Sequence, residues 1–324
     1  MTTLKDIARA ANVTVTTAAS ALSGKGRIGK DTKERILKIA ADLDYHPNIS
    51  ARALKNKTVI DIGMIMADDQ KMFVKPFLEY CETNGLRNQL ELISSSVRRF
   101  PGLLTPGFAK GILYVGNISG EVSEFIRKNP DYPIVTVNEG SPYCVCPDFE
   151  SGTKRAVQYL VAHGHRRIAM SYVTGTNYAK LQQIARAELS CWDKLNLDRS
   201  SDLLKPFGYR SSGLPDGTTE WICEMLDRKN PPTAFFFSGM QGARKLVYET
   251  MKRGLRIPED ISVISVGHEW ESICAYPEIS SVEQDFCETA MYALQMLQRR
   301  ISGMEIPEPQ LTTETKLILR SSTK

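Results

Sequence analysis

The stretch LKDIARAANVTVTTAASAL, from Leu4 to Leu22, decides the fold of the first part of the chain. Its apolar residues Ile7, Ala8, Ala18 and Leu22 recur at helical spacing on both sides of a short polar segment. We therefore predict two short amphipathic helices joined by a tight turn. A small reader of duplex DNA uses this arrangement, with one helix across the backbone and the second in the major groove.

The turn and a third helix complete the predicted head. Asn12 lies at the turn, where a positive φ is often needed and asparagine tolerates it well. Thr14 is suited to cap the second helix. A third helix is expected from about Asp31 to Asp42. Val13, at the turn, is also expected in the core of the head. The third helix is expected to close this core with Ile36, Leu37, Ile39, Ala40 and Leu43.

The second helix is expected to read bases. Val15, Thr16 and Ser20 should point outward toward base edges, and Thr17 toward a phosphate. Residues 1–57 carry 11 Lys and Arg against 5 Asp and Glu, whereas the remainder carries 30 against 32. The positive charge therefore gathers where the predicted DNA motif lies. In the loop after the second helix, Lys25 and Arg27 are the expected phosphate contacts.

A short helix that begins near Pro47 would be unstable alone. Two such segments from two subunits could pair through small residues and leave each Leu54 free to wedge between base steps in the minor groove. An ordinary linker with one leucine is the alternative. The full set of predicted DNA contacts is Thr3, Leu4, Thr14, Val15, Thr16, Thr17, Ser20, Lys25, Arg27, Asn48, Ala51, Leu54 and Lys55.

From Val59 onward the pattern changes to apolar runs of strand length that alternate with amphipathic segments. This alternation predicts parallel sheets with helices on both faces, and two successive sets predict two similar lobes. The fold class is thus a small all-α head plus an α/β core of two doubly wound parallel-sheet lobes. The expected boundaries are 1–46 for the head, 47–58 for the hinge and linker, and 59–324 for the core. The N-lobe is expected over about 59–147 and 282–310, and the C-lobe over about 148–281 and 311–324.

Composition excludes several classes of protein. No apolar run of 18 residues and no signal-peptide pattern is present, so we expect a cytoplasmic protein without a membrane span. Seven cysteines without framework spacing fit a reducing compartment. Cys144-Val145-Cys146 could suggest a metal or redox pair, although plain thiols are the favoured interpretation. No catalytic motif is present, so neither an enzyme, a cofactor nor a metal site is expected.

Several segments together resemble the LacI/GalR family of transcriptional regulators, over essentially the whole chain. The segments that carry this resemblance are Leu4–Ala8, Tyr45–Asn48, Ala51–Leu54, Gly164–Ala169, Pro232–Ala234 and Gly254–Ile264. The resemblance implies a homodimer on a near-palindromic operator, with an effector-sensing core built like a periplasmic binding protein. It also implies that Leu54 is a hinge leucine that kinks DNA, with Lys55 beside it.

The chain departs from the family pattern where effectors are usually gripped. Gln183 stands where the family commonly has an arginine, Gly239-Met240 replaces Asn-Asp, and Gly267 replaces an aspartate. In the second helix, Ser20 stands where many members have an arginine that could read guanine. Phe73 and Asp148 keep the pattern. The candidate effector residues are Phe73, Asp148, Asn177, Gln183, His268, Glu269 and Trp270.

Two interpretations of the core stay open. In the first, a different pocket is formed by Asn177, Gln183, His268, Glu269 and Trp270, with Trp270 stacking on a ring of a sugar-like or other metabolite. In the second, the core serves mainly for dimerisation. The expected function is a sequence-specific transcriptional regulator, most simply a repressor. The alternative is an architectural or constitutive DNA-binding regulator. Because no heptad tail follows the expected last strand, Leu311–Leu319, a dimer is favoured over a tetramer.

Overall fold

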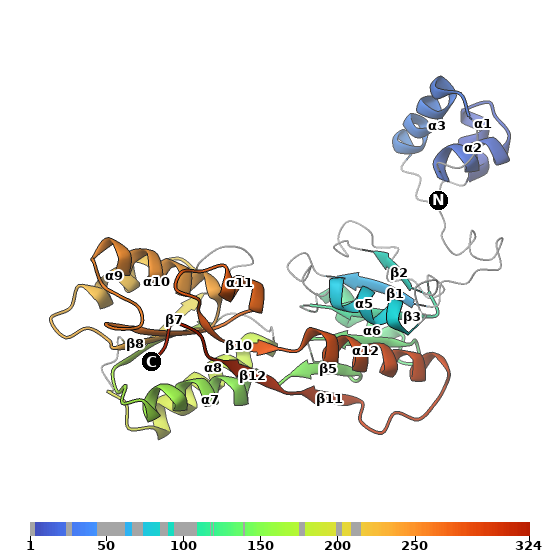
Figure 1. The fold of residues 1–324 in the computed structure, drawn as a ribbon. Helices are drawn as coiled ribbons and strands as arrows, with labels where there is room; N and C mark the ends of the chain where they lie inside the picture. Colours follow the sequence, from blue (N-terminus) through green and yellow to red (C-terminus); the bar gives the residue numbers. More distant parts are fainter. Residues whose placement is uncertain are drawn as a thin grey trace. The chain divides into compact units, whose positions relative to one another are not determined.

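The computed structural model describes residues 4–23, 28–43, 62–66, 74–84, 90–93, 109–116, 118, 120–138, 140–174, 179–198, 203–208 and 215–324. The chain divides into two compact units, Met1–Val59 and Ile60–Lys324, which we call the head and the core (Figure 1).

The head consists of helices α1 (Leu4–Ala10), α2 (Val15–Ser23) and α3 (Lys30–Asp42). Its buried centre is small and confirms most of the predicted core: Ile7, Ala8, Ala18, Ile36 and Ala40 are buried, and Val13, Leu22 and Ile39 pack against them. Ala11 and Ala21, which were not predicted, are buried as well. The prediction was wrong for Leu37 and Leu43, whose exposed fractions are 44% and 41%. Leu37 is turned about 100° around α3 from Ile36, and Leu43 follows the last helical residue.

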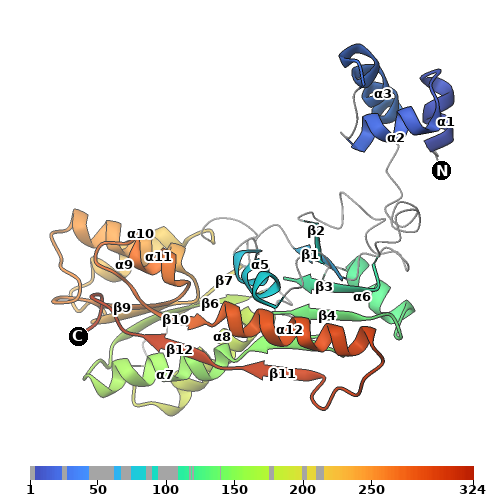
Figure 2. The same cartoon turned by 45° about the vertical axis from the view of Figure 1, so that its right-hand side comes forward.

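The first sheet of the core is entirely parallel, in the order β11-β5-β4-β3-β1-β2. Its strands are β1 (Ile62–Met66), β2 (Leu90–Ile93), β3 (Gly111–Val115), β4 (Ile134–Val137), β5 (Cys144–Pro147) and β11 (Gln310–Thr313). Helices α5 (Val74–Thr83), α6 (Gly120–Lys128) and α12 (Phe286–Ile301) belong to this lobe. One face of β4 and β5, with Val135, Val137 and Val145, packs against α12 (Figure 2).

The second sheet has the order β12-β10-β9-β8-β6-β7 and is parallel except for its edge strand β12. Its strands are β6 (Ile168–Thr174), β7 (Leu204–Gly208), β8 (Ala234–Phe237), β9 (Ser262–Val266), β10 (Ser280–Gln284) and β12 (Thr315–Ile318). Its helices are α7 (Phe149–Ala162), α8 (Ala179–Lys194), α9 (Thr218–Leu226), α10 (Met240–Lys252) and α11 (Glu269–Ile273).

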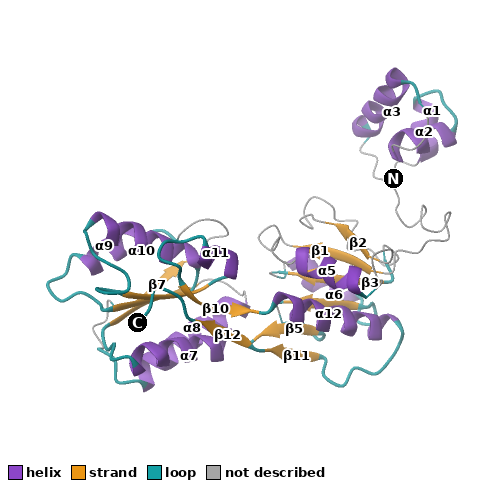
Figure 3. Ribbon diagram, in the orientation of Figure 1, coloured by secondary structure: helices purple, strands orange, loops and turns teal. Residues whose placement is uncertain are grey.

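Both faces of this second sheet are covered, as a doubly wound sheet requires. Helices α9 and α10 lie on one side of the sheet, and α7 and α8 on the other (Figure 3). Phe235 and Phe237 of β8 pack toward α9 and α10, whereas Phe236 packs toward α7 and α8. The alternation follows from the period of two along a strand. The predicted α/β core of two parallel-sheet lobes is thereby confirmed, with one antiparallel edge strand added.

Three segments connect the lobes, at Asp148 after β5, at Asp285 before α12, and at Glu314 between β11 and β12. The lobes therefore exchange near residues 285 and 314 rather than at 282 and 311. The expected single last strand, Leu311–Leu319, was wrong because β11 and β12 belong to different sheets. Asp148 N–H donates to Thr313 O at 2.8 Å, and Thr315 Oγ1 donates to Asp148 O at 2.7 Å, so two of the connections lie side by side.

Candidate nucleic-acid interface and ligand pocket

The turn between α1 and α2 is a Schellman motif built on Asn12. Asn12 has φ 48°, as its place in the sequence predicted. Its N–H donates to Arg9 O at 3.2 Å, and Val13 N–H donates to Ala8 O at 3.0 Å. These bonds satisfy carbonyls at the end of α1, and Val13 packs against the small core. The turn thus fixes the direction in which α2 leaves α1.

Helix α2 is capped by Thr14, which confirms the predicted cap. Thr17 N–H donates to Thr14 Oγ1 at 3.1 Å, and the two hydroxyl oxygens lie 2.8 Å apart. If Thr14 donates in this second contact, the Thr17 hydroxyl keeps its proton for another acceptor. The cap therefore leaves Thr17 able to donate to a phosphate oxygen.

The outward face of α2 is polar but uncharged. Val15 is 41% exposed and Thr16 is exposed, whereas Ser20 and Thr17 are half-buried. Thr16 and Ser20 are four residues apart and share one face of the helix. Lysine, arginine, aspartate and glutamate are absent from α2. This face can offer hydroxyl and methyl groups to base edges, while positive charge comes from α1 and α3.

In the core, the predicted effector residues Asp148 and Gln183 meet at the start of α7. Asp148 caps this helix, because its Oδ1 accepts from Ser151 N–H at 2.9 Å. Gln183 Oε1, on α8, accepts from Phe149 N–H at 2.8 Å. Two N–H groups that have no partner within the helix are thereby satisfied by side chains. A substituted Cβ at Gly152 would overlap Thr315 Oγ1, so this end of α7 also packs closely against β12.

Lys180 and His268 extend this region. Lys180 Nζ lies 4.6 Å from the centre of the Phe149 ring. The His268 ring lies 4.9 Å from that of Phe286, and its Nδ1 has no hydrogen-bond partner among the described residues. Burial, reinforced by the charge of Lys180, lowers the pKa of His268 to about 3. His268 is therefore a neutral imidazole, able to exchange hydrogen bonds with an uncharged polar group.

Glu269 and Trp270 do not lie at the start of α7 with Gln183. Glu269 and Trp270 are exposed on α11, and the exposed fraction of Trp270 is 47%. The guanidinium of Arg244, on α10, lies 5.9 Å from the Trp270 ring centre, and its Nη2 donates to Glu271 O at 3.1 Å. The side chain of Trp270 is thus associated with the surface of α10.

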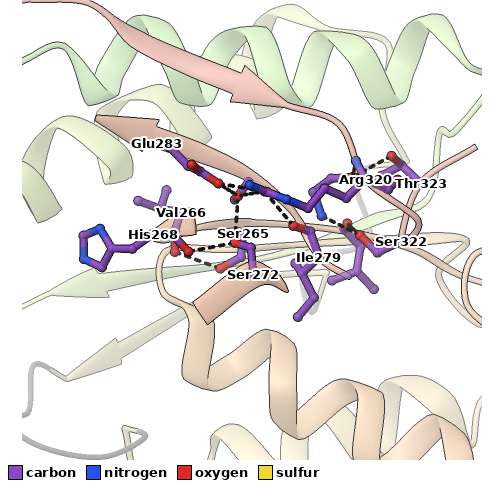
Figure 4. Close-up of polar contacts among 12 residues, drawn as sticks. Ser265, Val266, His268, Ser272, Ile279, Glu283, Arg320, Ser322 and Thr323 are labelled. Atoms are coloured by element: carbon purple, nitrogen blue, oxygen red, sulfur yellow. Dashed lines mark hydrogen bonds and ion pairs between the residues drawn. The ribbon is translucent and has the colours of Figure 1, made fainter. Parts of the chain in front are cut away.

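A buried polar network supports the segment that carries His268 (Figure 4). Arg320 Nη1 lies 2.7 Å from Glu283 Oε1 and donates to Ser281 Oγ at 2.6 Å. Ser281 Oγ lies 2.9 Å from Ser272 Oγ, which donates to His268 O at 3.0 Å. The C-terminal residues are thereby connected to the start of α11. Neither Arg320 nor Lys180 could be predicted from the sequence, because their roles depend on partners far away in the sequence.

A cavity of about 780 Å³ lies beside the connection between β5 and α7. Its lining comes from both lobes: Gly140, Ser141, Pro142, Cys144, Cys146, Ala179, Gln183, Gln310, Leu311 and Thr312. Of the predicted effector residues, Gln183 is part of this lining. The hydrogen bond from the Cys146 thiol, and more weakly one from Ser141 N–H, outweighs burial and lowers the pKa of Cys144 to about 6.

Part of the predicted site lies outside the described residues. This applies to Phe73 and Asn177 among the effector candidates and to Thr3, Lys25, Arg27, Asn48, Ala51, Leu54 and Lys55 among the DNA contacts. Leu4 begins α1. Within the described ranges, no helix is long and apolar enough to cross a membrane. The same ranges contain no group of three or more His, Cys, Asp or Glu side chains placed to hold a metal ion.

Comparison with known proteins decides the family. Residues 3–48 match the profile described as bacterial regulatory proteins, lacI family, and residues 157–323 match the periplasmic binding protein-like domain. The chain belongs to the LacI family. The catabolite control protein A of Priestia megaterium is 23% identical over 99% of both chains. The repressor PurR of Vibrio atlanticus is 25% identical over 100% of this chain and 99% of its own.

Solved structures share the LacI-family fold over the full length. The lac repressor dimer bound to operator and the anti-inducer ONPF has a TM-score of 0.69 at 19% identity, covering 99% of both chains. The transcriptional regulator CelR in complex with cellobiose has a TM-score of 0.65 at 22% identity, covering 99% of this chain and 100% of that one. As a LacI-family member, the chain is a DNA-binding transcriptional regulator and not an enzyme.

Proposed function

We propose that this LacI-family regulator is a repressor that binds a near-palindromic operator as a homodimer, in the cytoplasm. The observation that carries the proposal is the uncharged outward face of α2, fixed by the turn at Asn12 and the cap at Thr14. A reading helix held rigidly at its N-terminal end can place side chains against base edges at the accuracy that discrimination needs.

Base discrimination is assigned to Val15, Thr16 and Ser20, and phosphate contact to Thr17. Hydroxyl groups contact several bases, whereas an arginine makes a bidentate contact with guanine. The half-site should therefore differ from one read by an arginine at position 20. Ser20→Arg should shift the preferred half-site toward a guanine. Selection of bound sequences with both proteins tests this, and an unchanged motif would remove Ser20 from the reading surface.

The contacts outside the described residues remain part of the proposal. Leu54 is assigned the minor-groove wedge, with Lys55 beside it on a phosphate and Asn48 and Ala51 in the pairing hinge. Leu54→Ala should reduce affinity for the operator much more than affinity for random DNA, because wedging depends on a deformable central step. Equal losses on both DNAs would contradict the wedge.

The remaining head contacts are assigned to the phosphate backbone of DNA, on the basis of charge and position. They are Thr3, Leu4, Lys25 and Arg27. Arg27→Ala should lower affinity for specific and random DNA alike and should reduce the salt dependence by about one counterion. The matched control is Arg127→Ala, which removes an exposed arginine from α6 of the core and should leave the salt dependence unchanged. A normal salt slope in Arg27→Ala would contradict its phosphate contact.

Dimerisation is assigned to exposed apolar side chains on neighbouring helices α10 and α11. Tyr248 and Met251 on α10 are 56% and 67% exposed, and Trp270 and Ile273 on α11 are 47% and 49% exposed. Arg244 joins the two helices and lies one turn from Tyr248 on the same face of α10. A patch of this kind marks an interaction site. Tyr248→Lys should shift the mass measured by light scattering from dimer to monomer, and an unchanged dimer would place the interface elsewhere.

The effector is proposed to be an uncharged, hydrogen-bonding small molecule of the sugar-like class. The neutral imidazole of His268 lies in the region of Lys180 and Phe149, and Gln183 holds the adjoining helix start. The other candidates are Phe73, Asp148, Asn177, Glu269 and Trp270. Asp148 acts through α7, and Trp270 acts through α10. The alternative is a core that only dimerises.

Metabolite fractions distinguish these two functions. Operator affinity of the purified dimer should change by about 5- to 150-fold with one fraction. His268→Ala should lose that response while keeping the basal operator affinity. If no fraction changes the affinity of the normal protein, the effector proposal fails and the constitutive alternative holds.

A further inference from the structure

Two thiols lie together on the cavity side of the first sheet. Cys144 and Cys146 are two residues apart in β5, so their side chains leave the same face of the strand. Val145 points the opposite way and belongs to the apolar cluster under α12. Both cysteines line the cavity of about 780 Å³, Cys144 buried and Cys146 half-buried.

Polar side chains lie beside the pair on both neighbouring strands. In the parallel register, Gln310 and Thr312 of β11 lie opposite Cys144 and Cys146, and both also line the cavity. Thr136 of β4 lies opposite Cys144. Cys191 offers a contrast, because it is buried in the apolar cluster between α7, α8 and β6. A structural cysteine behaves as a small apolar side chain and favours a position such as that of Cys191.

The two sulfur atoms are within reach of each other. Both side chains leave the same face of β5 and line the same cavity, and a hydrogen bond from Cys146 is the main cause that lowers the pKa of Cys144 to about 6. A direct disulfide fits poorly. Side chains two residues apart leave a strand in parallel, so their Cβ atoms are about 6.6 Å apart, whereas a disulfide needs Cβ atoms about 3.5–4.5 Å apart. A bridging atom with bonds of about 2.3 Å to each sulfur spans the pair without pulling the strand together.

We propose that Cys144 and Cys146 form a two-thiolate site for a thiophilic metalloid or soft metal ion at the rim of this cavity. Soft ions prefer thiolate ligands, and the open cavity gives access to the half-buried Cys146. The inference depends on the core alone and not on operator binding. With a trivalent arsenical as ligand, two As–S bonds form, the As–O bond breaks, and the oxygen leaves as water with both thiol protons. No oxidation or reduction takes place.

Phenylarsine oxide tests the site on the full-length, reduced protein. We expect one equivalent to bind, and the mass increase to fall on the tryptic peptide Asn129–Lys154, which holds these two cysteines and no other. 2,3-Dimercaptopropanol should release it, whereas an equal thiol concentration of 2-mercaptoethanol should not. Release by the monothiol, or an adduct on another peptide, would overturn the proposal.

Variants provide an independent test. Cys144→Ser and Cys146→Ser should each weaken binding about 100-fold or more, because two-point attachment is reduced to one. The control Cys274→Ser/Cys287→Ser, at two exposed positions, should bind as the normal protein does. Thermal unfolding shows whether each variant is folded. If a variant is unfolded, the mass of the labelled peptide from the normal protein still decides whether these two cysteines bind the arsenical. Undiminished binding by a folded Cys144→Ser/Cys146→Ser variant would also overturn the proposal.

Discussion

Gln183 Oε1 accepts a hydrogen bond from Phe149 N–H at 2.8 Å, so a side chain of α8 completes the start of α7. Asp148, immediately before α7, accepts from Ser151 N–H, two residues further along the same helix. Because α7 begins at a connection between the lobes, these two bonds hold the second lobe at the point where the chain enters it. Gln183 therefore has a structural role at the start of the second lobe.

Gln183→Ala should destabilise the core by about 1 kcal/mol, because Phe149 N–H loses its acceptor. Urea unfolding of the full-length protein measures the change. Gln158→Ala, at an exposed position on α7, is the matched control and should leave the free energy of unfolding unchanged. Equal stability of the two variants would show that the bond from Phe149 contributes nothing.

Thr14 and Thr16 separate stability from recognition in the head. Thr14→Ala removes the cap on α2 and should cost about 1 kcal/mol of head stability. Thr16→Ala removes an exposed side chain and should instead change the selected DNA sequence. Hydrogen exchange of the α2 amides in the full-length protein measures the first effect. Faster exchange in Thr16→Ala than in Thr14→Ala would contradict these assignments.

Glu188 gives the core a specific pH dependence. Its side chain is fully buried on α8, and neither carboxylate oxygen has a hydrogen-bond partner among the described residues. Burial raises the pKa of Glu188 well above its usual 4.5. The folded state therefore keeps a proton that the unfolded state releases, and stability falls as the pH rises above about 4.5.

Glu188→Gln removes this titration, so its stability relative to the normal protein should increase with pH. The increase cannot exceed about 1.4 kcal/mol per pH unit for one group. Urea unfolding at a series of pH values from acid to neutral measures it. A difference between the two proteins that stays constant across the series would mean that Glu188 is not protonated in the folded state.

Arg320 and Glu283 form a buried ion pair, with side chains 8% and 14% exposed. Arg320→Met should cost about 3–5 kcal/mol, because it leaves the Glu283 carboxylate buried without its partner. The double variant Arg320→Met/Glu283→Gln should recover much of that loss. Calorimetry of the normal protein, of the single variants Arg320→Met and Glu283→Gln, and of the double variant measures this coupling. Additive losses would show that the two side chains act independently.

An exposed ion pair provides the comparison. Lys128 Nζ lies 2.7 Å from Glu124 Oε1, but both side chains are more than half exposed. Glu124→Gln should change the unfolding temperature little, because solvent screens such pairs. A loss of stability as large as that of Arg320→Met would mean that burial does not determine how much an ion pair contributes to the stability of this protein.

The sequence was sufficient to predict the elements that repeat a simple pattern. The positive φ of Asn12, the cap at Thr14 and the buried strands such as Ala234–Phe237 follow from residue type and spacing. It was insufficient for β11 and β12, because nothing in the stretch LTTETKLIL, from Leu311 to Leu319, shows that the chain changes sheets at Glu314.

The candidate site was predicted less completely than the fold. Gln183 and Asp148 were found because they occupy positions of a family pattern, but their use as helix caps depends on the N-terminus of α7. Lys180 and Arg320 were missed, since Phe149 and Glu283 are distant in sequence and only tertiary packing brings them close.

Selection of bound sequences from a random duplex library, with the purified full-length protein, tests operator binding by a homodimer. We expect a near-palindromic motif with two half-sites and a flexible pyrimidine–purine step at its centre. Thr16→Ala should alter the half-sites and leave their spacing unchanged. A single asymmetric half-site, or no enriched motif under any metabolite fraction, would contradict a homodimeric operator-binding repressor.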